Sequence, residues 1–227
     1  MNSSLRCFTF SQQTEMKEKY LLLSLLLCFS FVIYSCAQDR YIRFETQQVI
    51  LNDFEAEGYI LAIGGGGEGT IGRLKGSQVI AIDILKSELE EAPDGPLKII
   101  MDARDLQFLD NTFYTATPFF TLMYIDGNDL KKVFSEAYRV LKPGGKLLIW
   151  DAIIPKRTDS VKDRVLVPLI IKLPDKDVET GYGVRLPEED HDLSYYISLA
   201  EKTGFRVVSK ETINRVIYLE LKKITLE

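Results

Sequence analysis

Residues 61–69 read LAIGGGGEG, an apolar run that leads directly into a glycine-rich loop. Gly64, Gly66 and Gly69 match the pattern G-x-G-x-x-G, in which glycines allow a tight turn and a close approach of the backbone to a ligand. The next apolar run, Gln78–Asp83, ends in a carboxylate that can accept both hydroxyls of a ribose. The stretch therefore predicts a buried strand followed by a binding loop for a cofactor that contains a nucleoside.

Beyond this loop, short apolar runs alternate with helical patterns, which is typical of βα units in a parallel sheet. Near-continuous runs such as VIAID and KLLIW indicate strands that are covered on both faces. The chain closes with an amphipathic helix from Asp192 to Thr203, ended by Gly204, and an expected antiparallel hairpin that turns around Thr212 to Asn214. The predicted parallel strands are Tyr59–Ile63, Gln78–Asp83, Leu97–Met101, Phe113–Phe120 and Lys146–Ala152.

The composition argues against several classes of site. The 227 residues include 28 basic and 33 acidic side chains, for a formal charge of −5, so a nucleic-acid partner is not expected. All three cysteines lie within the first 36 residues and His191 is the single histidine, which leaves no set of ligands for a metal. His191 lies in a polar run and is predicted to be a solvated residue before a helix. A small-molecule partner is therefore favoured, with no metal.

The first 36 residues are interpreted as an export signal. Lys17 and Lys19 precede an apolar run from Leu21 to Tyr34, and small residues follow. The sequence Ile33-Tyr34-Ser35-Cys36 resembles a bacterial lipobox, in which Cys36 would carry the lipid. The alternative is an uncleaved anchor facing the cytoplasm, although the apolar run alone is shorter than the ~20 residues of a spanning helix. Both hypotheses predict membrane association, as an exported lipoprotein or as an anchored protein.

The boundaries of the remaining parts follow from the composition. Met16 would begin a signal of ordinary shape, so translation is predicted to start there. Residues 37–57 are polar and are predicted to be a connector. Residues 58–227 are predicted to be the folded domain, with an insertion at about 157–187 that covers the mouth of the sheet.

Three downstream segments separate the two cofactors that such a loop can bind, a nicotinamide dinucleotide and S-adenosylmethionine. The segments MDARDLQFLDNTF, YTATPFFTLMYI and EAYRVLKPGGKLLIWD resemble the class I S-adenosylmethionine-dependent methyltransferases with a type 11-like methyltransferase domain. The resemblance runs from about Gly58 to Ala152, and RVLKPGG is its most specific string. It implies a Rossmann-like, doubly wound, mainly parallel seven-stranded sheet with an antiparallel C-terminal hairpin.

The resemblance also implies roles for single residues. Gly64, Gly66 and Gly69 would face the methionine part of S-adenosylmethionine, and Asp83 would face its ribose. The adenine and the methyl donor would be bordered by Asp102, Ala103 and Phe119. Weaker candidates for binding the methyl acceptor are Phe120, Tyr124 and Asp151, and two further residues near the expected mouth are Tyr182 and His191.

Three positions depart from the family pattern, one of which is Tyr114, at the start of the expected fourth strand, where Phe-Asp is common in the family. Ala62 stands where family members carry an acid that fixes the glycine loop and the ammonium end of the cofactor. A hydrogen bond to a charged group contributes about 1.5–3 kcal/mol, so its loss predicts roughly ten- to hundred-fold weaker binding. Pro118 lies late in an expected central strand, where proline removes a donor from the ladder.

Three functions are compatible with the sequence alone. The leading hypothesis is a methyltransferase that acts on a small-molecule or lipid-like acceptor at a membrane surface. Methyl transfer requires alignment of a nucleophile and exclusion of water, so a missing histidine pair does not argue against it. The second hypothesis, motivated by Ala62 and Cys36, is a catalytically silent lipoprotein that uses the fold as a binding module. The third, an NAD(P)-dependent oxidoreductase, has only the glycine pattern and Asp83 in its favour.

Overall fold

The computed structural model describes residues 19–20, 40–159 and 161–224. The predicted signal with its lipobox Cys36, and the predicted start at Met16, lie outside these residues. Within them, no helix combines the length and the apolar character that crossing a membrane requires. A compact unit begins at Ile42 and contains the whole seven-stranded sheet described below.

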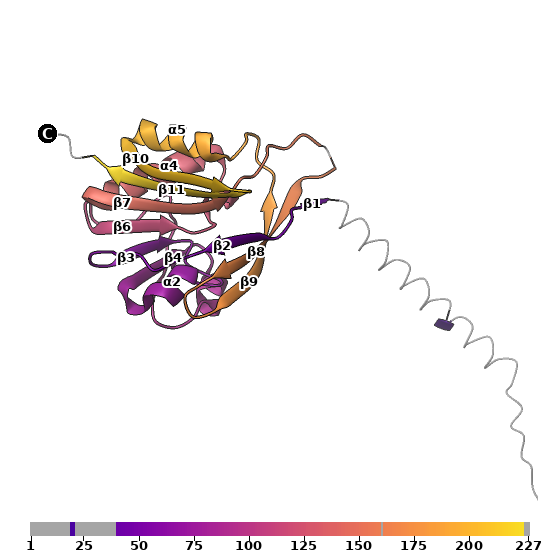
Figure 1. The fold of residues 1–227 in the computed structure, drawn as a ribbon, viewed down its shortest axis with the longest axis horizontal. Coiled ribbons are helices and arrows are strands. Elements are labelled where there is room, and N and C mark those ends of the chain that lie inside the picture. Colours follow the sequence, from indigo (N-terminus) through magenta and orange to yellow (C-terminus); the bar gives the residue numbers. More distant parts are fainter. Residues whose placement is uncertain (1–18, 21–39, 160, 225–227) are drawn as a thin grey trace, which may run out of the picture. The chain divides into compact units, whose positions relative to one another are not determined.

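A seven-stranded sheet forms the centre of this unit, with the order β10-β11-β7-β6-β3-β4-β5 (Figure 1). The strands β7, β6, β3, β4 and β5 are parallel to their neighbours, whereas β11 is antiparallel to both β7 and β10. This is the mainly parallel α/β sheet with a C-terminal hairpin that the sequence predicts. Its strands are β3 (Ile60–Ile63), β4 (Val79–Asp83), β5 (Leu97–Ile100), β6 (Phe113–Pro118), β7 (Leu141–Ala152), β10 (Phe205–Ile213) and β11 (Val216–Lys223).

Pro118 of β6 and the proline of the Pro-Gly-Gly segment in β7 lie where the hydrogen-bond ladder tolerates a missing donor. Pro118 is the last residue of β6, opposite Ile63 of β3, so its missing donor falls at the strand end. Strand β7 begins at Leu141, earlier than the predicted Lys146, because Leu141 is buried and pairs with Phe113. The ladder between β6 and β7 shifts register directly after this pair, and the Pro-Gly-Gly segment occupies the shift.

Helices α4 (Gly127–Val140) and α5 (Leu193–Thr203) cover one face of the sheet (Figure 1). The helical spacing of α4 buries Leu130, Val133 and Phe134 against this face, as the sequence predicts. Helix α5 begins after Asp192, whose side chain accepts a hydrogen bond from the Tyr195 amide at 2.8 Å. The helix ends at Thr203 and is followed by the capping residue Gly204, which has a φ of 105°.

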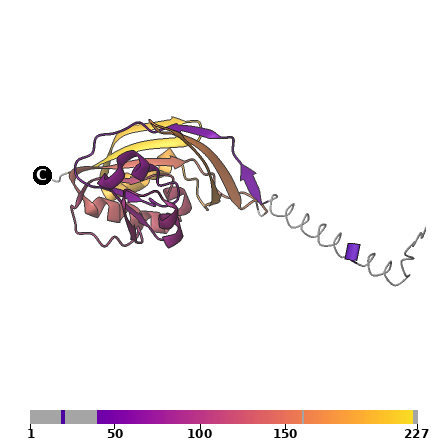
Figure 2. The same cartoon turned by 90° about the horizontal axis from the view of Figure 1, so that it is seen from below.

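A second, smaller sheet covers the other face, together with short helices. Its order is β1-β8-β2, and β9 pairs with β8 as an antiparallel hairpin (Figure 2). Residues 37–57 are therefore not a simple connector, because β1 and β2 come from them. The predicted insertion is the β8–β9 hairpin. The elements on this side are β1 (Tyr41–Arg43), β2 (Gln47–Ile50), α2 (Thr70–Lys75), η1 (Gly76–Gln78), α3 (Lys86–Glu91), β8 (Arg164–Lys172) and β9 (Asp177–Arg185).

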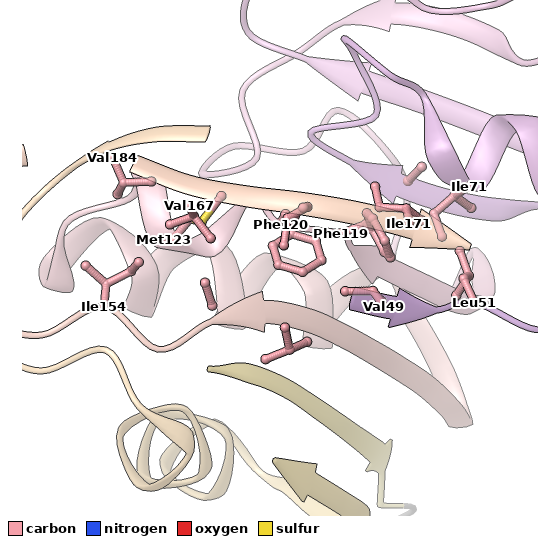
Figure 3. Close-up of a cluster of buried hydrophobic side chains, with 14 of the residues drawn as sticks. Val49, Leu51, Ile71, Phe119, Phe120, Met123, Ile154, Val167, Ile171 and Val184 are labelled. Atoms are coloured by element: carbon pink, nitrogen blue, oxygen red, sulfur yellow. The ribbon is translucent and has the colours of Figure 1, made fainter. Parts of the chain in front are cut away.

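A buried apolar layer joins the second sheet to the first. Val167 and Ile171 of β8 lie beside Met123 and Phe119, which come from the segment after β6 (Figure 3). Alternate residues of β8 are buried, as expected for a strand with one covered face. Because β8 is fixed in this way, its partner β9 is held near the carboxyl ends of β3 and β6.

Candidate cofactor-binding site

Hydrogen bonds anchor the glycine loop after β3 to β4, to α3 and to the segment that follows β6. The Gly65 amide donates to the Ile82 carbonyl at 2.9 Å, and the Gly67 amide donates to the Glu88 carbonyl at 2.8 Å. On the other side, the Thr121 hydroxyl donates to the Ile63 carbonyl at 3.0 Å. The loop is therefore held at the edge where the parallel strands end, which is where ligands bind in open α/β sheets.

Several glycines of this loop cannot be replaced without moving their surroundings, and the closest contacts are those of Gly64 and Gly66. Gly64 has a φ of +65°, and an added Cβ would lie 2.4 Å from Thr121. At Gly66 a Cβ would lie 2.5 Å from the Cβ of Glu88 and 2.9 Å from a carboxylate oxygen of Asp83. The glycines therefore allow the loop to pack closely against its neighbours while it lines the pocket.

A pocket of about 960 Å³ lies at this edge of the sheet. Its lining includes all six residues from Gly64 to Gly69 and continues along the ends of β4 and β6 and the middle of β9. The structure thus brings together most of the residues that the sequence singled out. They are Gly64, Gly66, Gly69, Asp83, Asp102, Ala103, Phe119, Phe120, Tyr124 and Tyr182.

Asp151 does not line the pocket. Its side chain is fully buried, and its oxygens accept hydrogen bonds from the Met123 amide at 3.1 Å and the Ala152 amide at 2.8 Å. Burial raises the pKa of this carboxyl to about 7. Asp151 therefore fixes the 3-10 turn η2 (Leu122–Tyr124) behind the pocket instead of facing a ligand.

His191 is buried, which corrects the expectation of a solvated residue. Only 2% of its surface is exposed, and its backbone exchanges two hydrogen bonds with Ile154. Its ring stacks on Tyr195 with centroids 5.0 Å apart, and burial lowers the pKa of the imidazole. The local polarity of the sequence was misleading because the pairing with Ile154 draws the residue into the structure.

Acidic side chains dominate the charge of the pocket. The described lining contains one cation, Arg104, which pairs with Asp102 at 2.7 Å and with Asp129 at 2.5 Å. Burial, together with the nearby carboxylates, raises the pKa of Glu88. A ligand that carries positive charge is therefore favoured. The carboxylates of the lining are Glu68, Asp83, Glu88, Glu91, Asp102, Asp126 and Asp129.

Aromatic rings form the wall between the glycine loop and the β8–β9 hairpin. Phe120 lies 5.8 Å from Tyr182, and Tyr124 lies 6.3 Å from the same ring, measured between centroids. Phe119 contacts Phe120 edge to face at 5.0 Å. Phe120 also has a φ of 51°, and its amide donates to the Trp150 carbonyl at 2.7 Å. The wall offers flat apolar surface to a ligand.

Four residues of the site were missed in the sequence. Glu68 could have been noticed as the single charged side chain among the glycines of the loop. Glu88, Thr117 and Thr121 have no comparable signal, because their positions depend on how α3 and β6 pack against the loop.

Ala62 lies beneath the glycine loop, opposite Ala81 of β4 and Thr117 of β6. Thr117 is fully buried, lines the pocket, and its hydroxyl has no hydrogen-bond partner in the described structure. A buried hydroxyl without a partner is costly. The hydroxyl is therefore placed to donate to an acidic group at position 62 or to a polar group of a ligand.

We expect Ala62→Asp to raise the affinity for S-adenosylmethionine about tenfold or more, because Thr117 can donate to the new carboxylate and the ligand's positive charge gains a partner. Isothermal titration measures the change. Ala62→Asn, which has the same size without the charge, is the control and is expected to gain much less. Equal dissociation constants for the natural chain and a folded Ala62→Asp variant would contradict this expectation.

The pocket residues fit S-adenosylmethionine. The acidic lining suits its sulfonium and ammonium groups, and the glycine loop lines the pocket from Gly64 to Gly69. The side chain of Asp83, at the end of β4, points toward the loop, as the predicted ribose contact requires.

Comparisons with known proteins show which proteins this chain resembles. Residues 61–149 match the family model described as methyltransferase domain. The chain is 37% identical over 86 residues to the ubiquinone/menaquinone biosynthesis C-methyltransferase UbiE of Desulfotalea psychrophila, covering 36% of this chain and 34% of that protein. It is 42% identical over 65 residues to the sterol 4-C-methyltransferase strm-1 of Caenorhabditis elegans, covering 29% of this chain and 18% of that protein.

The fold is similar to that of solved structures over a larger part of the chain. A SAM-dependent methyltransferase from Methanosarcina mazei matches with a TM-score of 0.54 at 17% identity, covering 75% of this chain and 94% of that chain. The matching part of the present chain spans about a third or less of the two curated relatives. Residues 61–149 form a methyltransferase domain of the S-adenosylmethionine-dependent class, and S-adenosylmethionine is the cofactor of this class. The matches lend no support to an oxidoreductase or to a silent binding module.

Proposed function

We propose that the protein transfers a methyl group from S-adenosylmethionine to a small, flat, apolar acceptor. The observation that carries this proposal is the pocket at the strand ends, which combines an acidic glycine loop with an aromatic wall. Bound S-adenosylmethionine supplies an activated methyl group on a sulfonium. The chain's own residues would hold the cofactor and align the acceptor, and alignment is the main contribution that this reaction needs.

The residues divide into two groups along the pocket. Asp83 and the glycine loop would bind the ribose and the methionine end, and Asp102 and Ala103 would border the adenine. Phe119, which contacts Phe120 edge to face, would border the methyl donor, and the rings of Phe120, Tyr124 and Tyr182 would exclude water around the acceptor.

The character of the acceptor follows from the charges. The one cation of the described lining, Arg104, is already paired with two carboxylates, so an acidic acceptor would meet uncompensated negative charge. An apolar ring would instead pack against the aromatic wall. The names of the two relatives, which refer to quinone biosynthesis and to a sterol, suggest ring compounds of this kind. The apolar run from Leu21 to Tyr34 supports the further proposal that such an acceptor is met at a membrane.

The test is transfer of radiolabelled methyl from S-adenosylmethionine by the full chain, with a demethylated menaquinol, a sterol and a carboxylate-bearing phenol as acceptors. We expect label in an apolar ring compound and none in the acidic phenol. Tyr124→Ala, which shortens the wall at the pocket mouth, is expected to raise the KM for the acceptor about tenfold or more with little change in cofactor affinity. Transfer to the acidic phenol alone would contradict the proposed class of acceptor.

A further inference from the structure

Glu68 is the charged residue of the glycine loop, and the β8–β9 hairpin holds its carboxylate. The Thr180 hydroxyl donates to one carboxylate oxygen, and the Tyr182 hydroxyl donates to the other at 3.0 Å. Both donors come from β9, which packs on the loop from outside the seven-stranded sheet. The carboxylate is therefore fixed in position by two neutral groups.

The negative charge of Glu68 is not balanced by these partners. Within the described ranges, no lysine or arginine side chain forms an ion pair with its carboxylate. Burial and the neighbouring charge of Glu68 raise the pKa of Tyr182, so its hydroxyl stays protonated and continues to donate. A carboxylate that is held in place and lines a pocket without a cation is suited to bind a cationic ligand group.

The location of Glu68 decides which ligand group it meets. Its partner Tyr182 contacts Phe120 and Tyr124, so the carboxylate lies on the side of the pocket toward the end of β6. The Asp83 carboxylate lies at Gly66 and the Glu88 carboxylate at Gly67, on the side of β4 and α3, where the ribose is expected. The methionine end of the cofactor would therefore extend toward Glu68.

We propose that Glu68 binds the α-ammonium group of S-adenosylmethionine, in place of the acid that is absent at Ala62. Thr180 and Tyr182 are positioning residues that aim the carboxylate into the pocket. The inference rests on the proposed function, since it requires that this cofactor binds. It gives the hairpin insertion a role in cofactor binding in addition to its aromatic contribution to the acceptor site.

The test measures binding of three probes to the full chain by isothermal titration. The probes are S-adenosylmethionine, S-adenosylhomocysteine and 5′-methylthioadenosine, which keeps the nucleoside and sulfur but lacks the amino acid. Glu68→Gln is expected to weaken binding of the first two probes about ten- to hundred-fold and to leave the affinity for methylthioadenosine unchanged. The control is Glu90→Gln, which removes the same charge from α3 at a surface pair with Lys86 and is expected to change no affinity.

Two further variants separate binding from a structural role. Tyr182→Phe keeps the ring but removes the donor, so we expect several-fold weaker binding of S-adenosylmethionine with methylthioadenosine unaffected. The double variant Ala62→Asp with Glu68→Gln is expected to recover part of the lost affinity, because the charge returns from the other side of the loop.

The outcomes distinguish a failure of the proposed function from a failure of the role proposed for Glu68. If the natural, folded chain binds none of the three probes, the proposed function fails. If it binds S-adenosylmethionine and Glu68→Gln binds it equally well, the role of Glu68 is overturned while the proposed function stands. If Glu68→Gln weakens all three probes alike, Glu68 shapes the loop and does not bind the ammonium group, and the inference is again overturned.

Discussion

Gly64→Ala is expected to reduce the affinity for S-adenosylmethionine by about a hundredfold or more and to cost about 2–4 kcal/mol of unfolding free energy. The new Cβ would lie 2.4 Å from two atoms of Thr121, so Thr121 or the loop must move. Since the Thr121 hydroxyl bonds the Ile63 carbonyl, such a movement displaces the end of β3 as well. Titration calorimetry and urea unfolding measure the two effects.

Gly58→Ala is the matched control. Gly58 has the same φ of +65°, but an added Cβ would find no atom within 4 Å. The substitution therefore carries the backbone strain of about 1–2 kcal/mol without the clash, and cofactor affinity should not change. If the two variants lost equal stability and neither lost affinity, the close packing of Gly64 against Thr121 would have no role in binding.

Asp151→Asn is expected to change how stability depends on pH. The folded-state pKa of Asp151, about 7, lies above the value of about 4 for an unfolded aspartate, so the folded state binds the proton more tightly. This tighter proton binding stabilises the fold at low pH, and the stabilisation is lost as the pH rises from about 4 to 7. The free energy of unfolding of the variant, relative to that of the natural chain, should therefore rise by on the order of 2 to 3 kcal/mol from pH 5 to pH 8.

Urea unfolding of both proteins at pH 5 and pH 8 checks this expectation, with the difference between the proteins compared at the two pH values. The comparison cancels the other groups that titrate in this range. At low pH the variant is expected to be less stable, because the asparagine amide cannot accept hydrogen bonds from both the Met123 and Ala152 amides. A difference that stays constant with pH would show that Asp151 does not titrate between these values.

The parts of the fold that the sequence predicts well depend on local signals. The runs VIAID and KLLIW are β4 and part of β7, and the apolar stripe from Leu130 onward is the buried face of α4. Gly204 ends α5 as expected, because a left-handed residue after a helix is readily supplied by glycine. The glycine loop is also predicted correctly at the end of the first parallel strand, because an apolar run followed by glycines is a local signal.

The parts that could not be predicted depend on pairing between distant segments. Residues 47–50 look like part of a polar connector, yet they form β2 because Val49 packs beside β8. The hydrogen bonds from Thr180 and Tyr182 to Glu68 likewise require the hairpin to lie over the loop. Asp151 could be placed at the end of a strand, but its sequence gives no sign that it faces η2 instead of the pocket.

Cofactor binding at the glycine loop can be measured by titrating S-adenosylmethionine and S-adenosylhomocysteine into the full chain, purified in a mild detergent and shown to be folded by circular dichroism. We predict saturable binding of both ligands with one site per chain, despite alanine at position 62, and competition between them. A folded sample that binds neither ligand would contradict the assignment of the pocket at the glycine loop as a cofactor site.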